Sequence, residues 1–376
     1  MKKHKIGIVG GGLTGLISAL SLSNLNIDID LIYRNEKGMD KDNRATAISE
    51  GNLKFLKDNI SSLSTSLFNS VKKINLFYEK GTEINNFLNF QENKSLIYFF
   101  ENDKFKTYLT KKLIKSKVEV INKKLKKIDI TDNKIFLDNK SHRYDLIILC
   151  LGTQSPIYEK VIGNREINKN YNEFSITGNV EHQINDLGAK QFFLKEGPLA
   201  ILPFKRKTFS IVWSIEKKYF STLEQNLTEN VQNKLEQLLK TKKIKIKRIK
   251  KYPLKLSLKK NYFKKNTIVL GDGLHSVHPV AGQGFNLVLR DIKSIKELIE
   301  YNLSLGLPIK NSTIPKDFSN KRKPENILFS LGIDTTRNFF KSNKYTDPFK
   351  KSILDSFSKS KFLKNLAKKI ANTGIT

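Results

Sequence analysis

Apolar and polar residues alternate along this chain with two different periods, and each period predicts a different kind of element. Short, nearly continuous apolar runs are typical of buried strands, and they occupy residues 6–9, 27–32, 144–152 and 267–270. Apolar residues at helical spacing follow the first run through Leu16 and Leu20, and the last run through Phe285 and Leu289. This succession of buried strands and amphipathic helices predicts an α/β domain.

Two other stretches consist of short runs that alternate apolar and polar residues, as strands do. They span 71–99 and 162–258 and predict a second, β-rich region inserted into the first. A helix start at Glu101 follows the first of these stretches, and after residue 340 the chain becomes basic and helical. We therefore expect an α/β domain at 1–70, 100–161 and 259–340, a β-rich domain at 71–99 and 162–258, and a basic helical tail at 341–376.

The composition is that of a soluble globular protein with one large or two medium domains. The chain has 376 residues, of which 39% are hydrophobic and 28% charged. Cys150 is the single cysteine, which excludes an intramolecular disulfide and a multi-cysteine zinc site. The apolar part of the N-terminus is too short for a signal-peptide core, and no run reaches the ~20 apolar residues of a membrane span. We therefore expect a cytoplasmic location.

The net charge of +32 would attract a polyanion such as nucleic acid or an anionic membrane. The lysines are spread over the whole chain together with many Asn and Ile residues, so a compositional bias explains the charge equally well. Residues 242–251 alternate Lys and Ile, but no aromatic platform for stacked bases accompanies them. Without any nucleic-acid-binding module, we expect no nucleic-acid partner.

The end of the chain predicts an amphipathic helix. Helical spacing puts the apolar residues Phe362, Leu363, Leu366 and Ile370 on one side and Lys361, Lys364, Lys368 and Lys369 on the other. This is the form of a helix at an anionic membrane surface. A helix packed on the protein's own core predicts nearly the same pattern.

The first candidate for ligand chemistry is a G-x-G-x-x-G turn between the first strand and the first helix. Gly10 permits the tight turn, Gly12 lets a pyrophosphate approach the backbone, and Gly15 lets helix and strand pack closely. The acid that should bind ribose hydroxyls would fall near Tyr33 and is missing, and Glu36 could replace it only from the following loop.

The second candidate is the stretch 270–291, which passes from a strand through a glycine-broken turn into a helix. Asp272 can accept a hydrogen bond from a ligand hydroxyl, and Gly282 and Gly284 permit positive φ and close approach. The free N–H groups at the helix start favour a negatively charged ligand. His275 and His278 are three residues apart, but without a third cluster of ligands we expect no metal site.

This stretch resembles the second flavin motif of the FAD-dependent aromatic hydroxylases built like para-hydroxybenzoate hydroxylase. The sequence A-G-Q-G-F-N at 281–286, the pair Arg290-Asp291, and G-P-L-A-I-L-P with S-I-V-W within 197–213 narrow the resemblance to the ubiquinone-biosynthesis hydroxylases. The resemblance implies a Rossmann-like FAD-binding domain with the G-x-G-x-x-G turn, interrupted by a β-sheet substrate domain and followed by the helical tail.

The resemblance also implies which residues hold FAD. Arg44 would lie beside the flavin, Asp272 would bond the ribityl chain, and Pro279 would wall the ring. The backbone from Gly282 to Asn286 would stabilise charge at the N1–C2 edge. The complete expected set is Gly10, Gly12, Gly15, Arg44, Asp272, Pro279, Gly282, Gly284 and Asn286. No side chain is expected to act as an acid–base catalyst, because the oxidant is supplied by the cofactor.

The activity implied is hydroxylation of a prenylated phenol in ubiquinone biosynthesis through a flavin C4a-hydroperoxide, with O₂ and NAD(P)H as co-substrates. Leu151 and Tyr158 stand where the family has an aspartate and an arginine, which leaves the reductant open. The alternatives are a same-fold flavoprotein with another redox reaction and a non-catalytic scaffold of a biosynthetic complex. A location at the inner face of the membrane, with other ubiquinone-biosynthesis proteins as partners, would suit the substrate.

Overall fold

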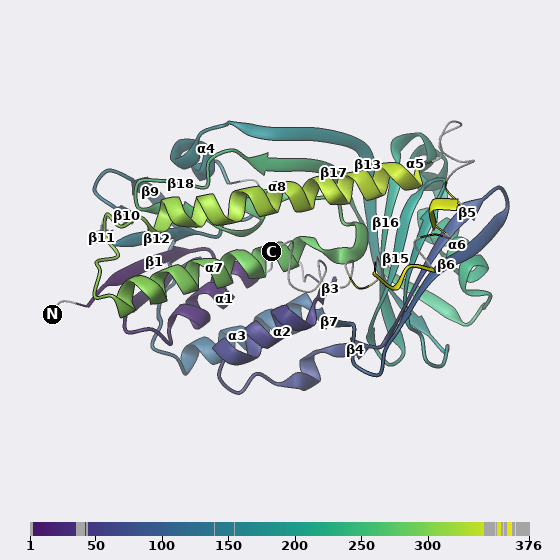
Figure 1. The fold of residues 1–376 in the computed structure, drawn as a ribbon, viewed down its shortest axis with the longest axis horizontal. Coiled ribbons are helices and arrows are strands. Elements are labelled where there is room, and N and C mark those ends of the chain that lie inside the picture. Colours follow the sequence, from purple (N-terminus) through teal and green to yellow (C-terminus); the bar gives the residue numbers. More distant parts are fainter. Residues whose placement is uncertain are drawn as a thin grey trace.

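The computed structural model describes residues 3–34, 42, 44–138, 140–153, 155–341, 350, 352–354, 356, 359–362 and 365. The molecule is elongated, with a helix-covered sheet at one end and a large, mostly antiparallel sheet at the other (Figure 1). The long helix α8 (Ile314–Phe340) runs from the first half to the second.

The first half is built on a six-stranded sheet. Its strand order is β18 (Phe263–Lys264), β19 (Thr267–Val269), β12 (Leu146–Leu149), β1 (Lys5–Val9), β2 (Asp28–Ile32) and β8 (Glu119–Ile121). All neighbours pair in parallel except β18 with β19. Since parallel strands are buried on both faces, the four residues of β12 are all buried.

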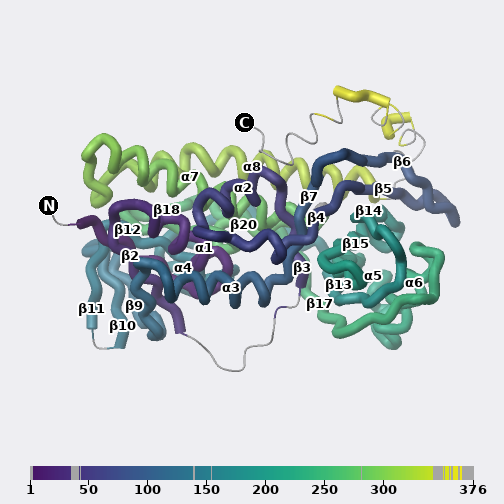
Figure 2. The backbone as a smooth tube through the Cα atoms, turned by 90° about the horizontal axis from the view of Figure 1, so that it is seen from below, coloured from purple at the N-terminus to yellow at the C-terminus, as the bar shows by residue number. Residues whose placement is uncertain are grey.

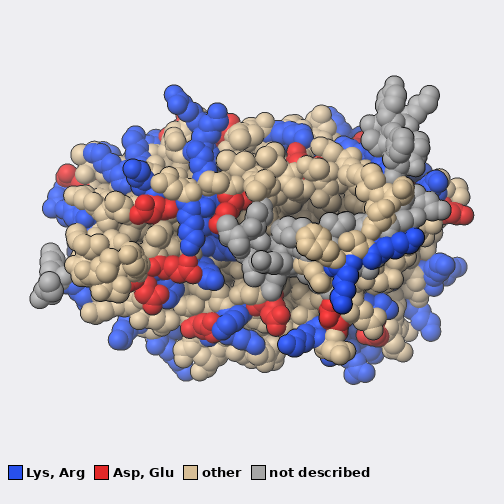
Figure 3. Space-filling view, viewed as in Figure 1, with Lys and Arg blue, Asp and Glu red and all other residues tan. Residues whose placement is uncertain are grey.

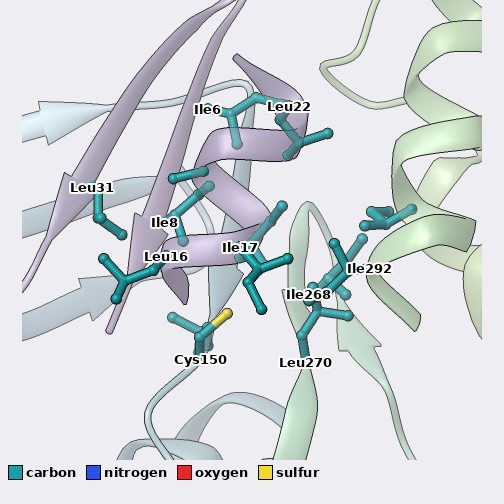
Figure 4. Packing of buried hydrophobic residues seen from close by; sticks show 14 of the residues in the cluster. Ile6, Ile8, Leu16, Ile17, Leu22, Leu31, Cys150, Ile268, Leu270 and Ile292 are labelled. Atoms are coloured by element: carbon teal, nitrogen blue, oxygen red, sulfur yellow. The ribbon is translucent and has the colours of Figure 1, made fainter. Parts of the chain in front are cut away.

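Helices cover this sheet and supply much of its core. They are α1 (Leu13–Leu22), α2 (Glu50–Asn59), α3 (Asn102–Ile114), α4 (Ile157–Ile162) and α7 (Gly284–Ser304). Figure 4 shows Leu16 of α1 near Ile8 of β1, whereas Ile17 of the same helix points toward Ile268 and Ile292. Ser49 caps α2 by accepting a hydrogen bond from the backbone N–H of Asn52.

The second half is an eight-stranded sheet. Its order is β20 (His275–Ser276), β17 (Ile244–Lys259), β13 (Glu166–His182), β16 (Thr208–Glu216), β15 (Gly197–Lys205), β14 (Ala189–Leu194), β5 (Lys73–Lys80) and β6 (Glu83–Gln91). Strand β14 pairs with β5 from much earlier in the chain, and the two lie side by side in Figure 2. Trp213 is 1% exposed in the core of this half, so it has a packing role there.

Two smaller sheets complete the structure. Strands β3 (Ala45–Ile48), β7 (Ile97–Glu101) and β4 (Asn69–Val71) form one between the halves, and β9 (Leu125–Asp129), β10 (Lys134–Leu137) and β11 (Lys140–Arg143) form the other. The first of these carries the chain from one half into the other, so that residues of both halves meet around it.

The predicted α/β fold class is confirmed: the structure contains the strand followed by the glycine turn, the helices that flank the parallel sheet, and the inserted β-sheet. The β-rich stretch also contains two helices that join the core of the large sheet: α5 (Lys217–Leu223) through Phe220, and α6 (Leu227–Leu239) through Val231 and Leu235. Most of the predicted amphipathic tail lies outside the described residues. Of its residues named above, Lys361 and Phe362 are described, and Phe362 is 74% exposed.

Candidate functional site

The three glycines of the turn between β1 and α1 have different surroundings: two are closely packed and one faces open space. Gly10 has φ of 127°, and a Cβ there would lie 2.1 Å from the Cys150 carbonyl oxygen. A Cβ on Gly15 would lie 1.9 Å from the carbonyl oxygen of Gly10. A Cβ on Gly12 would meet no described atom within 4 Å. The first and third glycines therefore permit close packing, whereas the second leaves open space at the start of α1.

Two helices begin at this edge of the parallel sheet. Helix α1 begins at Leu13 and α7 at Gly284, and neither has an acidic residue in its first turn. The two helices pack against each other. Gly282, with φ of 62°, precedes α7, and a Cβ on it would lie 3.2 Å from the Cβ of Ala47. Two N-terminal partial positive charges thus lie on one side of the molecule, which favours an anionic ligand.

Asp272 follows β19 in a short turn at the same edge. Gly271, with φ of 77°, brings this turn against Thr14 in the first turn of α1. The Asp272 carboxylate is accessible to solvent, yet the protein around it removes enough bulk water to raise its pKa, although the charges of His275 and Arg44 oppose this. A hydrogen bond from a ligand hydroxyl would stabilise an ionised carboxylate in such a site.

Arg44 is oriented toward the large sheet. Its Nε lies 2.7 Å from a carboxylate oxygen of Asp42, and its guanidinium lies 5.5 Å from the ring centre of Tyr252 on β17. Its charge also acts on Asp272. The structure therefore brings Arg44 and Asp272 close enough to interact, although they lie far apart in the sequence.

The side chain of Asn286, another of the residues expected to hold FAD, is hydrogen-bonded to other residues of the protein. Its Oδ1 accepts from the backbone N–H of Ser49 at 2.9 Å and from Nδ2 of Asn52 at 2.7 Å. Its Nδ2 donates to the carbonyl oxygen of Ala47 at 3.2 Å. The residue is fully buried. Its side chain therefore ties the start of α7 to the β3–α2 connection.

Tyr158, which stands where the resembling family has an arginine, makes two structural contacts of its own. Its hydroxyl accepts from the backbone N–H of Leu151 at 2.7 Å. A Cβ on Gly273 would lie 2.4 Å from the tyrosine ring, so the ring packs directly on the turn that carries Asp272. Leu151 itself is half-buried against the core of the first half. Tyr158 thus joins the loop after β12 to the Asp272 turn.

Two buried histidines make contacts that the sequence did not reveal. His275 Nε2 lies 2.7 Å from the Asp291 carboxylate, which also accepts from Nε of Arg322 at 2.7 Å. His278 Nε2 lies 2.8 Å from the carboxylate of Glu173. Within the described part of the chain, no group of three or more His, Cys, Asp or Glu residues could hold a metal ion.

An apolar cavity of about 510 Å³ lies where the halves meet. Its walls come from β3, β5, β6, β7, β14 and β15, and Val280 and Gln283 line it just before α7. Gln191 of β14, which is 6% exposed, also lines it. The apolar wall consists of Ala47, Ile74, Leu76, Phe90, Leu96, Ile97, Phe99, Ala189, Phe193, Ala200, Ile201, Leu202 and Val280.

A second cavity of about 1040 Å³ is polar and basic. Arg44 and Tyr252 line it, and strands β13, β15, β16 and β17 form its other walls. The cations along its wall are Arg44, Lys205, Lys247, Arg248 and Lys250, and the first three are paired with Asp42, Glu101 and Glu181 of the same wall. Arg44 therefore stands beside a large cavity whose cations exceed its carboxylates by two, which favours an anionic molecule.

Sequence comparison agrees with this geometry. Residues 143–300 match the FAD binding domain family. A ubiquinone biosynthesis monooxygenase, COQ6, from Dictyostelium discoideum is 31% identical over 41% of this chain and 38% of its own length. Ubiquinone hydroxylase UbiL from Rhodospirillum rubrum is 28% identical over 55% of this chain and 49% of its own. The matched region thus spans half or less of each relative, and the resemblance seen in the motifs is confirmed as sequence similarity.

Structural comparison covers nearly the whole chain. The crystal structure of p-nitrophenol 4-monooxygenase PnpA from Pseudomonas putida superposes with a TM-score of 0.78 at 17% identity, over 98% of both chains. At this identity the agreement is one of fold. Residues 143–300 are thus similar to the FAD binding domain family, and the chain shares its fold with p-nitrophenol 4-monooxygenase.

Proposed function

We propose that this protein is an FAD-dependent monooxygenase that hydroxylates a prenylated phenol, as its similarity to a ubiquinone biosynthesis monooxygenase and a ubiquinone hydroxylase suggests. The observation that carries the proposal is the position of the apolar cavity. It is lined by Val280 and Gln283, the residues that lead into α7 at the edge where the glycine turn and Asp272 also lie.

The residues at this edge fit FAD. The open space at Gly12 suits a pyrophosphate at the start of α1, and Asp272 suits a ribityl hydroxyl. The backbone of Gly282 and Gly284 would face the isoalloxazine, Pro279 would flank its ring, and Asn286 would act by holding this segment in place. When bound and reduced, FAD would supply the two electrons with which O₂ gives one oxygen atom to the substrate ring and the other to water.

The apolar cavity suits a ring with a hydrocarbon chain. Its volume of about 510 Å³ falls within the ~300–1,000 Å³ of small-molecule sites. Apolar walls exclude water from the reacting ring, and the amides of Gln191 and Gln283 offer hydrogen bonds to a phenol hydroxyl. Gln283 Oε1 has no hydrogen-bond partner among the residues that the structure describes.

The basic cavity is the proposed docking place for NAD(P)H. It offers cations for a dinucleotide's phosphates, and Arg44 is common to this cavity and the proposed flavin site. Leu151 stands where the family that the chain resembles has an aspartate after β12. We therefore expect NAD(P)H to reduce the flavin slowly.

We further propose peripheral attachment to an anionic membrane. None of the helices in the described ranges is long and apolar enough to cross a bilayer. Beyond Glu325 the charged residues of α8 are buried, while Leu328 and Leu331 are 53% and 54% exposed, which leaves an uncharged outer face. Thr336 on the same stretch lines the apolar cavity. Elsewhere on this side, Lys and Arg are scattered among other residues (Figure 3).

Purified protein tests the proposal in two steps. An absorbance spectrum should show a flavin band, and released cofactor should be FAD. With O₂, NADH or NADPH and a short-chain prenylated phenol, mass spectrometry should detect a product with one added oxygen atom. Bound flavin without that product would favour another redox reaction, and failure to bind FAD with retained binding of biosynthetic partners would favour a scaffold.

A further inference from the structure

His278 is fully buried and makes two hydrogen bonds that define its protonation state. Its Nδ1 accepts from the backbone N–H of Val280 at 3.3 Å, and its Nε2 lies 2.8 Å from the Glu173 carboxylate. An imidazole nitrogen that accepts a hydrogen bond carries no proton. The ring is therefore the neutral tautomer with its proton on Nε2, and Nε2–H donates to Glu173.

Glu173 connects this histidine to two other parts of the fold. It belongs to β13 of the large sheet and is 1% exposed in its side chain. Arg337 of α8 donates to both of its carboxylate oxygens. Nζ of Lys341 lies 3.2 Å away. The large sheet, the end of α8 and the loop before α7 thus meet at one buried carboxylate.

The electrostatics keep this arrangement in one protonation state. Burial alone would raise the pKa of Glu173, but His278 and Arg337 outweigh it and lower the pKa to about 2. Burial also lowers the pKa of His278, with Arg337 acting in the same direction and Glu173 and Asp334 against it. The Tyr171 ring lies edge-on at 5.1 Å and completes the surroundings. At neutral pH the pair is an ionised carboxylate and a neutral imidazole.

We propose that His278 and Glu173 are positioning residues for the flavin loop, here residues 279–284, and that they fix this loop to the large sheet. The inference rests on the FAD site proposed above. His278 acts through Val280, which lines the apolar cavity, and the loop carries Pro279 and Gly282 toward the proposed flavin position. The distance between flavin ring and substrate cavity is then set by the contact between β13 and His278.

The two bonds of His278 can be removed separately. In His278→Asn the amide oxygen can still accept from Val280 N–H, but the side chain is too short to reach Glu173. In His278→Gln the amide can still donate to Glu173, but the acceptor for Val280 is lost. Glu173→Gln keeps an acceptor for Nε2–H and removes the charge that Arg337 neutralises.

His182 provides a matched control. Its Nδ1 accepts from the backbone N–H of Ile184 at 3.1 Å, two residues ahead as in His278, and it is buried. It lies nine residues beyond Glu173 on β13, which is about 30 Å along an extended strand. His182→Asn therefore perturbs a similar local contact away from the flavin loop.

Fluorescence titration of the apoproteins with FAD should give dissociation constants about tenfold higher for His278→Gln and His278→Asn, a factor that corresponds to one hydrogen bond to a charged or buried group. His182→Asn should bind FAD like the parent. In the parent, FAD affinity should also fall when the pH drops below the lowered pKa of His278, because imidazolium carries a proton on Nδ1 that opposes Val280 N–H. The two His278 variants should lack this step.

The results separate failure of the inference from failure of the proposed function. If the parent binds no FAD at any pH, the proposed function fails. If the parent binds FAD and the His278 variants bind it equally tightly with the same pH profile, the positioning role is refuted. If His182→Asn weakens FAD binding as much as the His278 variants do, the effect is general destabilisation and the inference is also refuted. Circular dichroism of each apoprotein verifies that the variants are folded.

Discussion

Replacing Asn286 with alanine should destabilise the protein itself, before any cofactor is considered. The asparagine accepts from Ser49 N–H at 2.9 Å and from Asn52 Nδ2 at 2.7 Å, and it donates to the Ala47 carbonyl at 3.2 Å. The side chain is fully buried, so the variant removes these three hydrogen bonds away from solvent, while Asn52 Nδ2 keeps its 3.4 Å contact with the backbone carbonyl oxygen of residue 286.

A buried polar group without its partner costs about 1–3 kcal/mol. Asn52 can rotate to find another acceptor, whereas the backbone groups of Ser49 and Ala47 are fixed by β3 and α2. We therefore expect the free energy of unfolding to fall by about 3 kcal/mol, a large share of the ~5–15 kcal/mol that holds a typical protein folded.

Urea unfolding of the apoproteins, followed by circular dichroism, measures this loss. Asn24→Ala is the matched control, since its Nδ2 donates to the Asn59 carbonyl at 2.9 Å in an exposed position; it should change the stability by less than about 0.5 kcal/mol. An Asn286→Ala variant as stable as the parent but with weaker FAD binding would refute this reasoning, because the side chain would then serve the cofactor.

Four further outcomes are expected. Asp272→Ala should weaken FAD binding by about 1–3 kcal/mol, because a flavin hydroxyl loses its acceptor; unchanged affinity in a fluorescence titration would exclude this role. Stopped-flow reduction by NADH or NADPH should be slow in the parent and faster in Leu151→Asp, and a fast parent would show that the carboxylate is dispensable. Because its folded pKa is lowered from 4.5 to about 2, Glu173 contributes stability that is complete above pH 4.5 and lost as the pH falls toward 2; acid unfolding of Glu173→Gln should lack this component. Cutting the chain before Lys361 should reduce co-sedimentation with anionic vesicles, and salt should weaken it as the screening length shrinks from ~10 Å at 0.1 M to ~3 Å at 1 M; intact binding with a lower melting temperature would make the tail a structural brace.

The sequence determined the features that depend on neighbouring residues. The glycine turn at Gly10 joins a strand and a helix as its spacing predicts, and Ser49 caps α2. The apolar run before Asp272 forms a buried strand, with the glycine-broken turn and helix after it. Each of these follows from local periodicity, capping and backbone freedom, which a sequence displays directly.

The tertiary structure alone decided which distant residues meet. A histidine pair three residues apart suggests a shared ligand, yet His275 bonds Asp291 and His278 bonds Glu173, so the two side chains serve different helices and strands. The Asn286 side chain is likewise taken by the segment from Ala47 to Asn52 rather than left for a ligand. The apolar cavity needs walls from β5, β7 and β14, which lie far apart in the chain. The sequence around a polar residue is the same whether its side chain bonds solvent, a ligand or another element. The partner is determined only when the two halves of the molecule pack together.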